Sequence, residues 1–77
     1  MTEYELGQKL KEMYEEGIQK KEKTTQIHLF GIIYADVIRG NNLNIVEIIK
    51  FSGISSSYNV EVNKGIKLSK YVELKHT

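Results

Sequence analysis

Apolar residues recur at helical spacing near the start of the chain. They follow one another at steps of three and four, which places them on one face of a helix: Leu6, Leu10, Met13 and Tyr14. Thr2 and Glu5 have the spacing of a capping box, in which each side chain accepts a hydrogen bond from the other residue's backbone N–H. Gly17 is a typical stop, so the pattern predicts a helix over about residues 3–16.

The polar, lysine-rich stretch 17–25 predicts a connector. Thr24 or Thr25 would cap a second helix, which runs to about Arg39 and ends at Gly40. Its apolar residues fall on two faces, one with Ile27, Phe30, Tyr34, Ala35 and Ile38 and the other with Leu29, Ile32, Ile33 and Val37. In so short a chain one set of neighbours cannot easily cover both faces, so we expect a homodimer.

A glycine separates two short helical segments in the second half of the chain. Asn44 and Glu47 form another capping-box pattern, which predicts a third helix over residues 45–52. Gly53 supplies the left-handed backbone that a tight turn needs, and Ile54 follows it as an apolar plug. Two short helices that cross steeply around such a turn constitute a helix-turn-helix.

A fourth helix follows, and any of the three serines Ser55, Ser56 and Ser57 can cap it. It would end at Lys64, with Gly65 as its left-handed stop. Apolar residues at helical steps would face inward: Ile45, Ile48 and Ile49 from the third helix, and Ile54, Tyr58 and Val62 from the fourth segment. The helix-turn-helix therefore spans about residues 43–65.

Residues 66–77 form a C-terminal tail, in which residues 70–74 alternate between polar and apolar and could form one short strand. Such a strand would need a partner, most simply from a second copy of the chain. The patterns together predict an all-α fold: a single small four-helix domain over residues 1–77, with a helix-turn-helix and room for that one strand.

Composition narrows the function classes. The chain has no Cys, and its two histidines, His28 and His76, lie too far apart in sequence to form a metal-ligand pair. No nucleophile, base or metal constellation is present, so we expect neither an enzyme nor a cofactor. No apolar run approaches 18 residues and the N-terminus is acidic, so we expect a cytoplasmic protein without a membrane partner.

Charge is unevenly distributed along a nearly neutral chain. The net charge is +1, but residues 1–38 carry −2 and residues 39–77 carry +3. The positive half contains the predicted helix-turn-helix, which favours a nucleic-acid partner only modestly.

Two resemblances follow from these residues. The run EIIKFSGISSS at residues 47–57 resembles the helix-turn-helix of bacterial repressors. It departs from that motif at two positions. Ile49 stands where a small residue is usual because the helices nearly touch, and Asn59 stands where a buried aliphatic is usual. We therefore expect a crossing that is looser or shifted by one residue.

The wider resemblance covers about residues 5–75. The runs IHLFGIIYA (27–35), SY (57–58) and NKGIKLSKYV (63–72) are similar to a family of small bacterial and phage proteins described as helix-turn-helix-like. That resemblance implies a tri- or tetra-helical fold and suggests DNA binding.

If the target is double-stranded DNA, the fourth helix would enter the major groove. Base edges would be contacted by Ser56, Ser57, Asn59 and Asn63, and phosphates by Lys64, Lys67, Lys70 and the backbone near Ser55. The protein would then be a small dimeric transcriptional regulator that contacts two half-sites about one helical turn apart.

Two features of the charge pattern argue against DNA binding and favour a different hypothesis. The chain has one Arg, and Glu61 lies within the fourth helix, whereas tight DNA binders usually neutralise about six or more phosphates. The same fold could instead bind a host protein, for example as a phage or mobile-element inhibitor of a host defence nuclease (anti-CRISPR-like).

Overall fold

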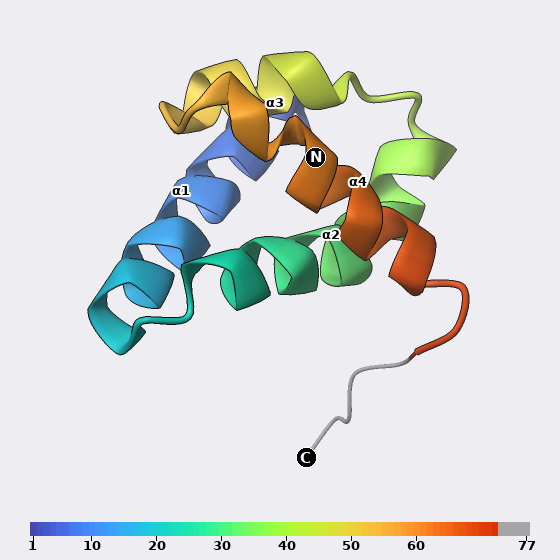
Figure 1. Cartoon of the computed structure of the whole chain (residues 1–77). Coiled ribbons are helices and arrows are strands. Elements are labelled where there is room, and N and C mark those ends of the chain that lie inside the picture. The colour runs from blue at the N-terminus through green and yellow to red at the C-terminus, as the bar shows by residue number, and fades with distance from the viewer. Residues whose placement is uncertain (73–77) are drawn as a thin grey trace.

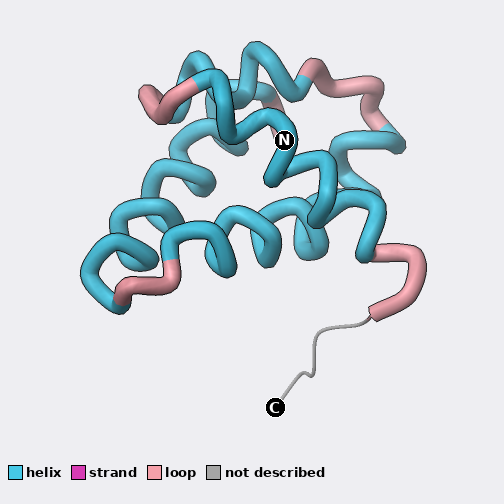
Figure 2. Tube along the Cα trace, viewed as in Figure 1, coloured by secondary structure: helices cyan, strands magenta, loops and turns pink. Residues whose placement is uncertain are grey.

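The computed structural model describes residues 1–72, which form four α-helices and one short 3-10 turn (Figure 1). The elements are α1 (Glu3–Lys20), α2 (Lys23–Gly40), α3 (Ile45–Ser52), η1 (Ser56–Tyr58) and α4 (Asn59–Leu68). The predicted all-α fold class is confirmed, and Figure 2 shows no strand in the described part of the chain. Residues 70–72 are turn and coil rather than strand, and the rest of the alternating segment, 73–74, lies outside the described residues.

α1 begins as predicted but continues past the predicted stop. The Thr2 N–H donates to Glu5 Oε1 at 2.9 Å and the Glu5 N–H donates to Thr2 Oγ1 at 3.2 Å, which completes the capping box. Lys21, with φ of 57°, ends the helix instead of Gly17. Gly17 is buried within α1, where a Cβ would lie 2.8 Å from the Cα of Lys23. This glycine therefore allows α2 to start close against α1.

The connector predicted at 17–25 is only a two-residue link. α2 starts before Thr24 and Thr25, so neither of them caps it. The N-cap position belongs to Glu22, whose side chain makes no capping hydrogen bond. The Glu22 N–H donates instead to the carbonyl of Gly17 at 2.7 Å, which joins the two helix ends directly.

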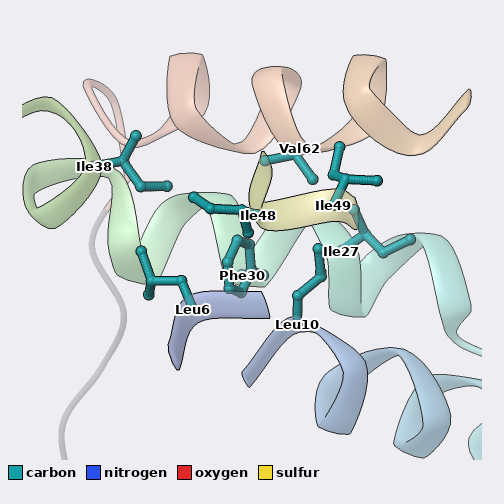
Figure 3. Packing of buried hydrophobic residues seen from close by; sticks show 8 residues of the cluster. All are labelled: Leu6, Leu10, Ile27, Phe30, Ile38, Ile48, Ile49 and Val62. Atoms are coloured by element: carbon teal, nitrogen blue, oxygen red, sulfur yellow. The ribbon is translucent and has the colours of Figure 1, made fainter. Parts of the chain in front are cut away.

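The helices pack as two pairs around the α1–α2 hairpin. α3 packs mainly against α1 and α4 mainly against α2, whereas α3 and α4 touch each other only sparsely (Figure 1). Figure 3 shows the buried side chains that all four helices send into the shared core: Leu6, Leu10, Ile27, Phe30, Ile38, Ile48, Ile49 and Val62. Of the six residues predicted to face inward from the second half of the chain, Ile48, Ile49 and Val62 are buried in this cluster. The other three, Ile45, Ile54 and Tyr58, are partly buried and pack against it.

Glycines bring α2 and α4 into backbone contact. A Cβ at Gly31 would lie 2.5 Å from the carbonyl oxygen of Val62, and a Cβ at Gly65 would overlap the carbonyl oxygen of His28. Gly65 therefore is not the helix stop that the sequence predicted, because α4 continues through it to Leu68. α4 accordingly ends three residues beyond Gly65, at Leu68.

None of the helices in the described part of the chain is long and apolar enough to cross a membrane. Within the same residues, His, Cys, Asp and Glu side chains form no group of three or more that could hold a metal ion.

Replacing Gly65 by alanine tests the backbone contact between α2 and α4. We expect Gly65→Ala to lower the free energy of unfolding by about 1–3 kcal/mol, because steric overlap outweighs the gain of ~1 kcal/mol in helix propensity. Urea titration followed by circular dichroism measures the change. Gly40→Ala is the matched control, since a Cβ there meets nothing within 4 Å. Equal stability of the two variants would contradict the contact.

Candidate nucleic-acid interface

The start of α3 is fixed to α1 as well as capped. Asn44 Oδ1 accepts from the backbone N–H groups of Val46 at 2.9 Å and Glu47 at 3.3 Å, as predicted for the cap. The second half of the capping box does not form with Glu47. The Asn44 N–H donates to Glu3 Oε2 on α1 at 3.2 Å instead. The first helix of the helix-turn-helix is thereby held by the hairpin.

Short polar side chains build the turn after α3. Gly53 has φ of 76°, which confirms its predicted left-handed conformation. Ser52 Oγ accepts from the N–H of Ile54 at 3.2 Å, a contact that the sequence pattern did not indicate. Ser55 Oγ accepts from the Ser57 N–H at 3.2 Å and shares a hydrogen bond with Ser57 Oγ at 2.9 Å. Ser55 is therefore the cap, but it opens η1 and the α-helix begins only afterwards.

α3 and α4 contact each other only sparsely, and each of them buries side chains in the core. Ile49 is buried where the usual motif has a small residue, and the few contacts between α3 and α4 are compatible with the loose crossing that the sequence predicts. Val62 is buried, and the ring of Tyr58 packs edge-on against Tyr14 at 5.5 Å between centroids.

Lys23 lies beside Tyr58 and lowers the pKa of that phenol, whereas contact with Tyr58 raises the pKa of Tyr14.

A family model described as an HTH-like domain matches residues 2–75, which is almost the whole chain. The chain belongs to the HTH-like domain family. No match was found among curated proteins or among solved structures.

One face of α4 remains exposed in this HTH-like domain. A shallow hollow on that face gathers four of the eight predicted DNA-contacting residues, Asn59, Asn63, Lys64 and Lys67, around Val60. Val60 is 60% exposed, although it is aliphatic. The prediction missed it, but the helical spacing of Val60 to Lys64 and Lys67 could have identified it as part of this face.

A second hollow lies between α3 and α4. It brings predicted Ser56 and Asn59 together with Val46 and Lys50 of α3, and Ile49 and Ile54 also line it. Asn59 thus borders both hollows. No sequence pattern indicated Val46 and Lys50, because their position depends on how α3 is placed relative to α4.

The remaining predicted residues, Ser55, Ser57 and Lys70, border neither of these two hollows. Ser55 and Ser57 bond to each other in the turn, and Lys70 is exposed just beyond the end of α4. The assignment of all eight residues to DNA contact stays a prediction.

Glu61 lies on α4 but is directed toward α2. Its side chain is 19% exposed, and its carboxylate oxygens lie 3.2 Å from His28 Nε2 and 3.1 Å from Lys64 Nζ. The Lys64 ammonium, followed by the His28 ring, holds the pKa of this carboxyl below its usual range. The acid that weakened the DNA hypothesis is therefore placed beside the exposed face, and it also engages one of the lysines on that face.

The single arginine of this HTH-like domain has a structural role. Arg39 Nη2 donates to the carbonyl of Ile66 at 2.8 Å and to Ser69 Oγ at 2.9 Å. These bonds satisfy acceptors at the C-terminal end of α4. Lysines are therefore the main cations that the α4 face can offer to a ligand.

The Glu61 contacts make stability depend on pH. The pKa of this carboxyl is lower in the folded than in the unfolded state, so the ionised group stabilises the fold. This contribution is complete when the pH is above the ordinary pKa of 4.5, and it is lost as the pH falls through the lower pKa of the folded state. We expect the stability advantage of the wild type over Glu61→Gln to shrink between pH 7 and pH 3, as measured by urea unfolding. Glu12→Gln, on the exposed side of α1, is the control, and a pH-independent difference for Glu61→Gln would contradict the ion pair.

Proposed function

We propose that this HTH-like domain binds double-stranded DNA as a small dimeric transcriptional regulator and inserts the exposed face of α4 into the major groove. The proposal rests on one observation: asparagine amides and lysines border a hollow on α4. This helix comes directly after the capped turn in the chain. Side-chain amides recognise base edges and ammonium groups bind phosphates, so this residue set fits a duplex.

The proposed contacts divide by chemistry. Base edges are contacted by Ser56, Ser57, Asn59 and Asn63, and phosphates by Lys64, Lys67, Lys70 and the backbone around Ser55. Lys50, which borders the hollow between α3 and α4, adds a further cation on the same side. Since Arg39 is used within the fold, phosphate binding depends on a few lysines per protomer, and a dimer doubles their number.

Removing a single lysine should change the salt dependence of binding. Each phosphate that the protein no longer neutralises makes the slope of log K against log salt concentration shallower by about 0.9. We expect Lys67→Ala to show this change in fluorescence anisotropy with a random-sequence duplex, because Lys67 is exposed on the α4 face. Lys11→Ala, an exposed lysine on α1, should leave the slope unchanged. Identical slopes for both variants, or no binding at low micromolar protein, would refute the proposal.

The dimer is proposed to form through the outer face of α2. Leu29 and Ile32 are half-buried there and Ile33 is 44% exposed, and the exposed Asp36 lies among them at helical spacing. α1 and α4 both pack against α2 and carry net charges of opposite sign, with five Glu and three Lys on α1 and an excess of lysine on α4. A second copy can therefore cover the three apolar side chains and offer complementary charge beside them.

A charged residue on this face should separate the protomers. We expect the wild type to sediment as a dimer and Ile33→Glu to sediment as a monomer with unchanged circular dichroism, because a buried unpaired carboxylate is strongly unfavourable. Ile18→Glu is the control, since Ile18 is 52% exposed on α1 and lies outside this face. A wild type that sediments as a monomer would exclude the dimer but leave DNA binding by single domains intact.

A protein-binding module, such as an inhibitor of a host defence nuclease, is the second candidate. One observation favours it: Tyr4 and Phe51 form an edge-to-face pair at 5.5 Å between centroids while remaining 56% and 45% exposed. Exposed aromatic pairs are typical of protein interfaces. The anisotropy titration with a random-sequence duplex separates the two candidates, because a protein-binding module need not bind DNA.

A further inference from the structure

The side-chain amides of Asn59 and Asn63 have a defined orientation. Asn63 Nδ2 lies 2.9 Å from the backbone carbonyl oxygen of Asn59, and a carbonyl oxygen can only accept, so the atom of Asn63 at this point must be the nitrogen. The same nitrogen lies 2.6 Å from Asn59 Oδ1, which must therefore be the oxygen of its amide. The two contacts together exclude a flipped amide at either residue.

This orientation determines what the pair can offer to a ligand. Asn59 Nδ2 and Asn63 Oδ1 make no hydrogen bond to any of the residues that the structure describes. One is a donor and the other an acceptor, and both amides border the hollow on α4. The pair therefore offers one donor, Asn59 Nδ2, and one acceptor, Asn63 Oδ1, at the border of the same hollow.

In the major groove, this arrangement matches adenine better than guanine. Adenine presents the N7 acceptor and the N6 amino donor, whereas guanine presents two acceptors, N7 and O6. A guanine would leave Asn63 Oδ1 opposite another acceptor, which is unfavourable. Cytosine presents only a donor and thymine only an acceptor on this edge, so each satisfies half of the pair.

Val60 adds an apolar group to the same hollow. It is the neighbour of Asn59 in sequence and is 60% exposed, so it contributes little to the core. The major-groove edge of DNA carries one methyl group, the C5-methyl of thymine. An exposed aliphatic side chain on this face thus has one apolar counterpart in a duplex.

We propose that Asn59 and Asn63 act as one bidentate recognition pair for adenine, and that Val60 contacts the methyl group of a neighbouring thymine. These three residues form an A·T-recognition triad. The triad rests on the proposed DNA binding and adds to it a base preference for half-sites that contain A·T pairs. Lys64 and Lys67, which flank the triad, supply affinity without sequence preference.

Base analogues test the triad atom by atom. Selection from a random duplex library with the full chain should enrich A·T pairs at a fixed position of the half-site. In the selected duplex, 7-deazaadenine removes the N7 acceptor and should weaken wild-type binding by roughly 5- to 10-fold, the value of one hydrogen bond to a base. Deoxyuridine removes the thymine methyl and should weaken binding by about fourfold.

The variants assign each penalty to a side chain. Asn59→Ala should bind the normal and the 7-deazaadenine duplex equally, and Val60→Ala should bind the thymine and deoxyuridine duplexes equally. Gln19→Ala, an exposed amide on α1, should retain both penalties. Circular dichroism verifies that each variant is folded.

The outcomes separate this inference from the function on which it rests. Enrichment of guanine at the fixed position, or analogue penalties that are the same in the wild type and in the variants, would overturn the triad while DNA binding stands. No binding to any duplex at low salt would overturn DNA binding, and the triad with it.

Discussion

The close approach of α2 and α4 is the constraint on which the rest of the fold depends. Gly31 and Gly65 let the two backbones touch, and no other residue type leaves that space. Because α4 is positioned by α2 and α3 by α1, the two helices of the helix-turn-helix need little direct packing against each other. A bulky Ile49 between them is therefore compatible with the fold, and the hairpin holds both in place.

The sequence predicted features that depend on local chemistry and missed those that depend on distant neighbours. The Thr2 and Asn44 caps and the left-handed Gly53 involve residues only a few positions apart, so their patterns are visible in the chain. Gly17 and Gly65 were predicted to end helices, but both lie within helices where another helix approaches. A glycine that ends a helix and one that allows close packing look alike until the neighbouring element is known.

The candidate site shows the same division. The sequence predicted a helix after the capped turn, and the spacing of Asn59, Asn63, Lys64 and Lys67 along that helix places them on one surface. The direction of the Glu61 carboxylate could not be predicted, because it depends on His28 of another helix. The positions of Lys50 and Val46 beside Ser56 likewise follow from the loose α3–α4 crossing rather than from any pattern within α3 or α4.

The exposure of Val60 has a consequence for how such a domain can diversify. Asn59, Val60 and Asn63 border a surface hollow, whereas Val62 and Gly65 on the same helix hold it against α2. Substitutions at the first three positions can therefore accumulate with little effect on folding, since surface changes usually alter stability by only about 0.5 kcal/mol or less. One scaffold can in this way present many different surfaces without changes to its core.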